Sequence, residues 1–238
     1  MHKLENQRPD GEEAERIRSI YADRDRQGWH SRYAWHRPVA NYQSMVRQRM
    51  FARAINASLG ADLSGLRVLD VGCGTGVFLR QLVEWGASPN LLMGTEYLAD
   101  RLERARQISP TTIDWRLGSL DFLAKETFDL VSSHTVFSSI LDETSRRELA
   151  MSMWDNVKPG GWVMVFDFRY NNPSNPNVRK VTRQELESYW SAQEHMFFLD
   201  MLAPPLARLL VAKNYLIAEL MTLMLPLLRS HFVFMARK

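Results

Sequence analysis

The chain has 238 residues and a mass of 27.6 kDa, enough for one α/β domain with a full core and too few for two ordinary domains with linkers. Hydrophobic residues make up 45% of it and charged residues 24%, which are ordinary globular values. The single cysteine, Cys73, excludes an internal disulfide, and the charged N-terminus lacks the apolar stretch of a signal peptide. We therefore predict one domain in the reducing environment of the cytoplasm.

The net charge of +3 is unevenly distributed along the chain. Residues 1–60 hold eleven Lys and Arg against seven Asp and Glu, and residues 179–238 hold eight against five, so the centre is acidic. Basic flanks favour an anionic partner, although an ordinary solvated surface explains them as well. The excess is small for a protein that binds the phosphate backbone of nucleic acids.

Two helices are predicted before the first strand. Asp10 and Glu13 have capping-box spacing and open a helix through about Arg24. Pro38 suits the first turn of a second helix that reaches about Ser58. A segment rich in aromatic and basic residues separates the two helices.

The rest of the chain is organised around V-L-D-V-G-C-G-T-G, residues 68–76. An apolar strand over 67–71 is followed by three glycines at alternate positions and by an apolar helical pattern over 77–85. Glycine permits a sharp turn and a close approach to a ligand, and the amides that open the helix suit a carboxylate or phosphate. The pattern predicts a nucleotide-type binding unit.

The spacing of the glycines indicates which nucleotide. A dinucleotide fingerprint would place its third glycine or alanine at Val77, but here the third glycine comes one residue earlier. The stretch instead resembles the first motif of the S-adenosylmethionine-dependent methyltransferases with a Rossmann-like fold. That resemblance implies S-adenosylmethionine as cofactor, held by this motif. We expect Cys73 to be a small filler within it rather than a nucleophile. The motif residues that the resemblance implies at the cofactor are Asp70, Gly72, Cys73, Gly74 and Gly76.

Further cofactor contacts are expected after the next strands. Glu96 ends a predicted strand over 90–95 and lies twenty residues beyond Gly76, the separation at which an acidic side chain reaches ribose hydroxyls. Tyr97 beside it is expected to pack on the adenine. A third strand over 112–117 precedes a turn in which related enzymes often carry an aspartate after a glycine. This chain has Ser119 there, so Ser119, Leu120 or a backbone group is expected to meet the adenine edge, with Ser133 as a further cofactor contact.

Two polar residues end central strands and are candidates for catalysis. His134 closes a fourth strand over 128–134, and ligands of open α/β sheets lie outside the carboxyl ends of strands. A hydroxyl acceptor loses a proton as it attacks, so a histidine base would assist it. Asp167, at the end of a fifth strand over 162–167, is the second candidate and His36 the third. A structural histidine bonded to its own loop is the alternative for His134.

Substrate contacts are predicted on two loops. In many members of the family an N-terminal segment covers cofactor and substrate, which makes Tyr33, Trp35 and His36 candidates; a hydrophobic staple between the two helices is an equal alternative. The loop after Asp167 holds three polar candidates: Arg169, Asn171 and Asn172. The asparagines either recognise a hydroxyl-rich substrate or only make Asx turns. They match no metal-ligand pattern, so no metal is predicted.

The most apolar piece of the chain is 202–229, between predicted strands over 196–199 and 231–236. Charged residues and prolines interrupt it, and its longest uncharged run, 220–228, is too short to span a membrane. The segment fits two helices broken near residues 213–214. This insertion is a packed cap, an apolar acceptor pocket, or a surface that touches a membrane or a second subunit.

The expected fold is a Rossmann-like three-layer α/β sandwich. Its sheet has seven mostly parallel strands in the order 3-2-1-4-5-7-6, the order that the resemblance implies. The single domain comprises an N-terminal helical lid over 1–60, a cofactor-binding core over 61–167 and a substrate side over 168–238 that contains the helical insertion 202–229.

The resemblance implies a methyltransferase, and the favoured reaction is O-methylation of a small-molecule or carbohydrate-like acceptor, anionic or lipid-linked. The alternative is C- or N-methylation of an apolar quinone-like or secondary-metabolite acceptor. An NAD(P)-dependent reductase is disfavoured by Val77 and by the lack of a Tyr-x-x-x-Lys pair, and a non-catalytic cofactor-binding protein stays open. Nucleic acid is not an expected partner, because residues 132–135 lack the Asn/Asp-Pro-Pro-Tyr/Phe motif. A monomer and a homodimer are both compatible with the sequence.

Overall fold

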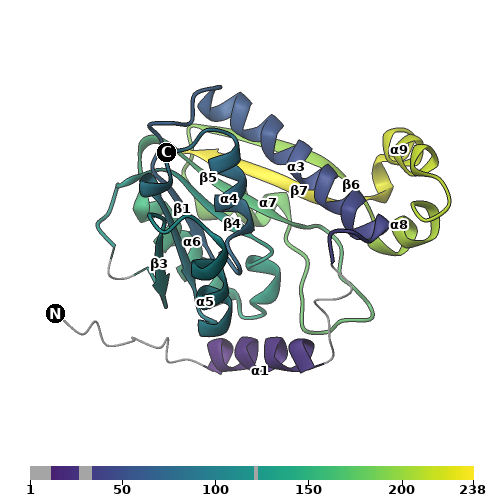
Figure 1. The fold of residues 1–238 in the computed structure, drawn as a ribbon, viewed down its shortest axis with the longest axis horizontal. Coiled ribbons are helices and arrows are strands. Elements are labelled where there is room, and N and C mark those ends of the chain that lie inside the picture. The colour runs from purple at the N-terminus through teal and green to yellow at the C-terminus, as the bar shows by residue number, and fades with distance from the viewer. Residues whose placement is uncertain (1–11, 27–33, 121–122) are drawn as a thin grey trace.

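The computed structural model describes residues 12–26, 34–120 and 123–238 (Figure 1). A single seven-stranded sheet runs through it in the order β3-β2-β1-β4-β5-β7-β6, as predicted, and β7 is antiparallel to both of its neighbours. The strands are β1 Val68–Val71, β2 Leu92–Glu96, β3 Asp114–Leu117, β4 Phe128–His134, β5 Val157–Phe168, β6 Glu194–Leu202 and β7 Arg229–Arg237.

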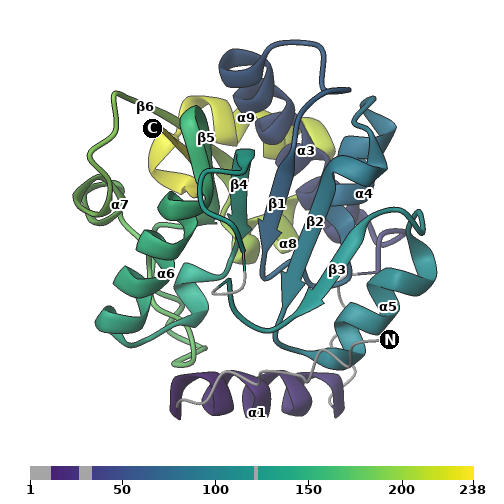
Figure 2. The same cartoon turned by 90° about the vertical axis from the view of Figure 1, so that its left-hand side faces the viewer.

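Helices cover both faces of the sheet and form three layers. Helices α3, α4 and α5 pack on one face, and α6 and α7 on the other (Figure 2). The α-helices are α1 Glu12–Arg26, α3 Pro38–Leu59, α4 Val77–Glu84, α5 Ala99–Ile108, α6 Glu143–Asn156, α7 Arg183–Tyr189, α8 Pro204–Leu210 and α9 Tyr215–Met224. Short 3-10 turns are η1 Pro89–Leu91, η2 Phe137–Ser139 and η3 Pro226–Leu228.

The central strands are buried on both faces, which explains their nearly continuous apolar sequence. Along β4, Leu130 belongs to the core under α3 and α4, while Val131 belongs to the core under α6. Successive side chains of a strand point to opposite faces, so one strand contributes side chains to both cores. Because β1 and β4 pair in parallel, with Asp70 opposite Ser132, their polar ends meet at one edge of the sheet.

The predicted boundaries hold best where apolar runs are long. β4 and α3 lie where the sequence predicts them, and α7 begins with the predicted capping box of Thr182 and Glu185. The predicted start of β5 is wrong: the strand begins at Val157, which pairs with Phe128, rather than at 162. The reason is that the amide of Gly160 donates to Lys238, which extends the sheet through the expected turn.

Helix α1 lies across the carboxyl ends of the central strands, below the arrowheads of β1, β2 and β3 in Figure 2. The Glu13 carboxylate accepts the amide of Leu141 at 2.6 Å, beyond the end of β4. On the other side, the Arg101 guanidinium of α5 stands 4.3 Å from the centre of the Tyr21 ring. The helix is thus fastened to two elements that flank this edge.

The region 202–229 forms α8, α9 and η3, the predicted pair of helices between β6 and β7. It projects from one end of the molecule, at the right of Figure 1. Tyr42 on α3 holds α9 through a contact with Thr222 at 3.3 Å, and Tyr215 donates to Asn41 at 3.2 Å. None of the helices in the described ranges has the length and apolar character needed to cross a membrane.

Candidate functional site

The turn from β1 into α4 is a bend of three glycines with positive φ, at +67° for Gly72, +56° for Gly74 and +74° for Gly76. A Cβ on Gly76 would stand 2.3 Å from the Trp115 ring, and one on Gly72 would stand 2.6 Å from Val136. A Cβ on Gly74 would meet no atom within 4 Å. Two glycines are therefore closed in by neighbouring side chains, and the backbone at Gly74 is open to a ligand.

Glu96, at the end of β2, lies directly beside this bend. Its carboxylate accepts the amide of Gly74 at 2.8 Å and the amides of Tyr97 and Leu98 at 2.7 and 3.1 Å. Burial raises the pKa of Glu96, and the three amides oppose that shift. A carboxylate has about four lone-pair sites, so about one is left for a ligand hydroxyl. The structure thus brings together the glycine bend and the acid that the sequence pairs with ribose.

A hollow of about 530 Å³ lies between α1 and the start of α5, two residues beyond Glu96 at Leu98. Its volume is in the range of small-ligand pockets. The amide of Gly118 donates to the Glu96 carbonyl at 3.0 Å, which brings the Ser119–Leu120 turn to the same edge as Tyr97. Glu96, Tyr97 and the Ser119–Leu120 turn fit the adenosine part of the predicted cofactor. The hollow is lined by Arg18, Tyr21, Ala22, Arg26, Leu98 and Asp100.

Asp70 and Cys73 of the motif are turned into the protein. Asp70 accepts a hydrogen bond from the Ser132 hydroxyl at 2.9 Å, and burial raises the pKa of Asp70 to about 7. Cys73 is buried, its amide donates to Thr95, and burial raises the pKa of its thiol well above the usual range. A protonated, enclosed thiol matches the expected small filler.

His134 lies in an aromatic cage rather than on an open surface. Its ring centre is 4.7 Å from that of Phe51 on α3 and 4.4 Å from that of Phe78 on α4. Its Nε2 is 3.6 Å from an Asp70 oxygen and makes no hydrogen bond with any described residue; the buried Ser133 hydroxyl also lacks one. Burial, assisted by the charge of Arg47, lowers the pKa of His134 to about 3. A neutral imidazole with so low a pKa is a weak base, which counts against the predicted role.

Asp167 is closed off from any acceptor. Its side chain is fully buried, and its oxygens accept the amides of Ser138 at 3.0 Å and Phe168 at 2.9 Å. Burial raises the pKa of Asp167 to about 6. These contacts fix the turn after β4 against the end of β5, so the structure gives this carboxylate a structural position.

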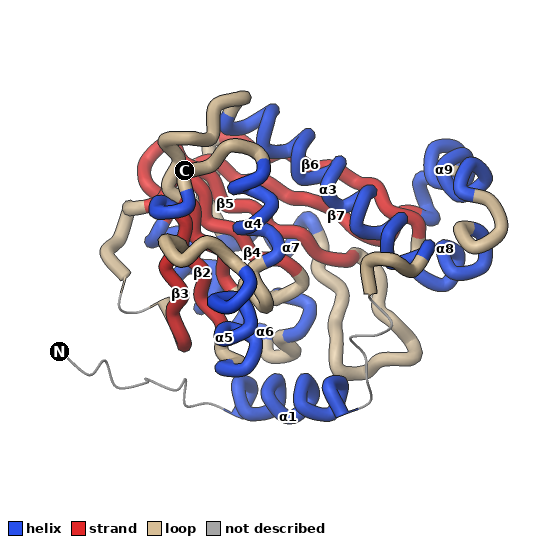
Figure 3. The backbone as a smooth tube through the Cα atoms, in the orientation of Figure 1, coloured by secondary structure: helices blue, strands red, loops and turns tan. Residues whose placement is uncertain are grey.

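The polar residues predicted to meet the substrate are not gathered at this site. Tyr33 lies outside the described residues, while Trp35, 60% exposed, and His36 stand on the surface before α3. The three candidates of the β5–α7 connection, the long tan loop of Figure 3, bond within the protein. Arg169 donates to the Pro226 carbonyl, whereas the side-chain oxygens of Asn171 and Asn172 accept backbone amides of their own loop. Asn172 therefore makes an Asx turn with Ser174, one of the two alternatives that its sequence allows, whereas Asn171 joins the start of the loop to Lys180.

The structure adds Arg47, which the sequence analysis missed. Arg47 lies one helical turn from Phe51 on α3, and its charge lowers the pKa of His134 and of His231. His134 ends β4, and His231 on β7 pairs with Phe168, the last residue of β5. The guanidinium is therefore near the carboxyl ends of β4 and β5. It makes no ion pair with a carboxylate among the residues that the structure describes. No sequence signal marks it, because an arginine on an amphipathic helix normally faces water.

Known proteins resemble this chain both in sequence and in fold. Residues 68–161 match a family described as "Methyltransferase domain". The ubiquinone biosynthesis O-methyltransferase of Paracidovorax citrulli is 33% identical over 115 residues, which cover 47% of each chain. A protein of that name from Chelativorans sp. is 29% identical over 150 residues, covering 58% of this chain and 56% of the relative. The matches span about half the length of these curated relatives.

Solved structures agree with this assignment of the fold. The N-methyltransferase NodS from Bradyrhizobium japonicum, in complex with S-adenosyl-L-homocysteine, superimposes with a TM-score of 0.60 at 18% identity, over 85% of this chain and 89% of that one. The chain therefore has the Rossmann-like fold that the class I methyltransferases share. Within it, residues 68–161 match the methyltransferase domain family. The predicted resemblance to the methyltransferase family is confirmed over residues 68–161, and S-adenosylmethionine is the cofactor that this resemblance implies.

Proposed function

We propose that the chain is an S-adenosylmethionine-dependent methyltransferase that acts on an oxygen of a small-molecule or carbohydrate-like acceptor. The observation that carries the proposal is the contact between the Gly74 amide and the Glu96 carboxylate beside an open glycine bend, within the matched methyltransferase domain. Oxygen is the favoured target because both curated relatives described above are named O-methyltransferases.

The residues around the bend fit the cofactor. The Gly74 backbone would face its amino-acid part, Glu96 a ribose hydroxyl, and Tyr97 with the Ser119–Leu120 turn its adenine. When bound, S-adenosylmethionine supplies an electrophilic methyl group. The positive charge of its sulfonium is lost during transfer, so the protein contributes mainly alignment and exclusion of water. Helix α1, fastened across the strand ends, is placed to exclude that water.

In this proposal, Arg47 determines which kind of acceptor oxygen reacts. A cation near a hydroxyl favours the ionised form and lowers its pKa by about 1–3 units. Arg47 stands near the carboxyl ends of β4 and β5, with neutral imidazoles beside it and no carboxylate partner among the described residues. An acceptor whose reacting oxygen becomes anionic, such as a phenol, therefore fits this position. Activation by Arg47 takes the place of the base that His134 was predicted to be.

The test is methyl transfer from labelled S-adenosylmethionine to matched acceptors: 3,4-dihydroxybenzoate, its amide and 3,4-diaminobenzoate. We expect label on oxygen of the dihydroxy compounds and none on the diamine. Label on nitrogen or carbon would instead support the alternative prediction of C- or N-methylation. If the chain binds the cofactor but methylates none of these acceptors, the result would contradict the proposed activity and favour a non-catalytic cofactor-binding protein.

A further inference from the structure

The helical insertion formed by α8, α9 and η3 holds more than half of the large apolar side chains that are exposed in the described residues. Of sixteen large apolar side chains that are exposed in the described residues, nine lie between residues 209 and 227. The most exposed are Leu227 at 79%, Met224 at 72%, Leu223 at 66% and Leu216 at 65%. Scattered single apolar residues need no explanation on a protein surface, but a concentration of this kind marks an interaction site.

Helix α9 has two different faces, and only one of them is used by the fold. Ala218 and Thr222 are buried, and Thr222 meets Tyr42 of α3. At 100° per residue, Leu216, Leu220 and Leu223 point away from Ala218 and Thr222, and all three are exposed. Leu220 and Leu223 also border a hollow between α9 and Arg49 of α3. The fold therefore anchors α9 by its inner face and leaves its outer leucines without protein contacts sufficient to bury them.

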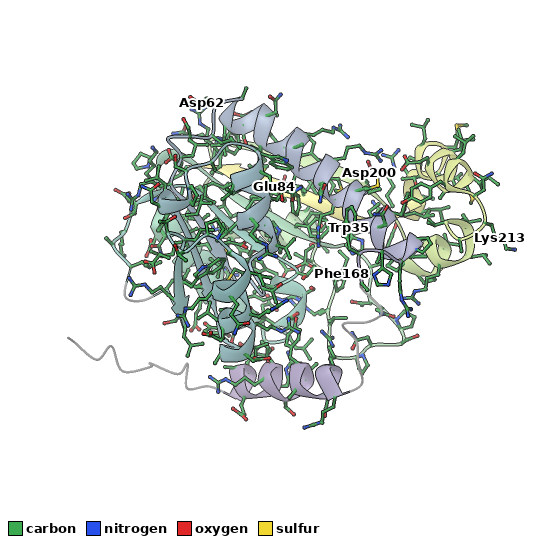
Figure 4. All side chains as sticks on the ribbon, viewed as in Figure 1. Trp35, Asp62, Glu84, Phe168, Asp200 and Lys213 are labelled. Carbon is green, nitrogen blue, oxygen red and sulfur yellow. The ribbon has the colours of Figure 1, made fainter. Side chains whose placement is uncertain are left out.

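The charges on the insertion are arranged around this outer face. Glu219 is the sole acidic residue between 201 and 238, and it turns inward to Arg49 of α3 at 3.3 Å. Arg208 and Lys213 are exposed and make no ion pair with any described residue. Figure 4 shows Lys213 at the outer tip of the insertion, away from the sheet. The exposed surface is thus apolar with unpaired cations at its margin, and its one carboxylate, Glu219, is neutralised by the ion pair with Arg49.

An aromatic residue with a polar tip borders the same surface. Tyr170 is 43% exposed, and its hydroxyl donates to the Leu227 carbonyl at 2.9 Å. The Arg169 guanidinium lies 4.6 Å from the centre of the Tyr170 ring. Tyrosine and arginine are amphipathic side chains that suit the boundary between headgroups and acyl chains.

We infer that the outer face of α8, α9 and η3 docks on an anionic lipid bilayer. Leu216, Leu220 and Leu223 would enter the boundary between headgroups and acyl chains, while Arg208 and Lys213 would meet the lipid phosphates. Charge complementarity favours this partner over a second copy of the chain. A symmetric pair through this face would bring its cations together without any carboxylate to oppose them. Peripheral contact of this kind requires no spanning helix.

The test is co-sedimentation of the full chain with vesicles of phosphatidylcholine alone and of an equimolar phosphatidylcholine–phosphatidylglycerol mixture, without cofactor. We expect binding to the mixed vesicles that weakens as salt is raised. Leu216→Ser with Leu223→Ser should weaken it by about tenfold per leucine. Arg208→Gln with Lys213→Gln should weaken it by about fivefold per charge. The matched control, Met45→Ser with Met151→Ser, removes two exposed methionines from α3 and α6 and should bind as the unchanged chain does.

Three outcomes would overturn the inference. Equal binding to both vesicle types would show that the contact does not depend on anionic lipid. If the folded chain binds neither vesicle type, the bilayer is not the partner of this surface. Sedimentation equilibrium would then show whether the same leucines join two copies of the chain. Binding that survives the leucine substitutions, with thermal melting unchanged, would place the contact elsewhere. Because no cofactor takes part, none of these results bears on the proposed methyl transfer.

Discussion

The glycine bend can be tested through Gly76, whose neighbourhood sets the size of the effect. An alanine there would keep φ near +74° and place its Cβ 2.3 Å from the Trp115 ring. The left-handed conformation costs about 1–2 kcal/mol for a residue with a Cβ. Pushing the buried Trp115 aside costs about 1–3 kcal/mol more, as overpacking does in other cores. We therefore expect Gly76→Ala to lower the free energy of unfolding by about 2–5 kcal/mol.

Urea unfolding followed by far-UV circular dichroism measures this effect. Gly74→Ala is the matched control, because it has the same sign of φ and open space around its Cβ, so it should cost only the conformational part. Trp115→Phe removes the ring atoms that meet the new methyl group. In the double-mutant cycle, Gly76→Ala with Trp115→Phe should regain about 1–3 kcal/mol of coupling energy. Equal costs at positions 74 and 76, or a cycle without coupling, would refute the reasoning.

Three further changes probe the site. Glu96→Ala should weaken S-adenosyl-L-homocysteine binding by about 10–150-fold, the loss of one hydrogen bond to a charged group. Glu84→Ala, which changes an exposed glutamate at the end of α4, should leave binding unchanged; calorimetry on both folded variants measures the difference. His134 stays neutral in the folded chain, so it contributes stability above its unfolded pKa that is lost as pH falls from about 6.5 toward about 3. Between pH 7 and pH 5 the unchanged chain should lose about 2 kcal/mol more stability than His134→Gln, measured by urea unfolding at each pH. The same variant should keep turnover within about tenfold, and a loss of 10²–10⁴-fold would return His134 to the role of base. Arg47→Met should move the pH–rate profile of a phenolic acceptor upward by about 1–3 units, whereas Arg47→Lys retains most of the effect; identical profiles would remove Arg47 from acceptor activation.

The fold was predictable from the sequence because its signals are local. The apolar run of β4, the proline that opens α3 and the capping box at Thr182 each act within a few residues of where they stand. The glycine bend and Glu96 were predictable for a similar reason, since a fixed spacing in one strand–helix–strand unit brings them together.

The environments of the catalytic candidates could not be predicted in this way. The pKa of His134 depends on Phe51, on Phe78 and on Arg47, which come from two helices far from it in the sequence. Asp167 is closed off by the amide of Ser138, twenty-nine residues away. A strand end predicts the edge of the sheet at which a side chain lies, but not whether neighbouring helices cover it.

Isothermal titration calorimetry of the purified chain with S-adenosyl-L-homocysteine, and in parallel with NADH, tests the central claim most directly. The geometry of Gly74 and Glu96 predicts saturable binding of one S-adenosyl-L-homocysteine per chain and no heat with NADH. Heat with NADH alone, or none with either S-adenosylmethionine or its demethylated product on a chain shown to be folded, would contradict the account.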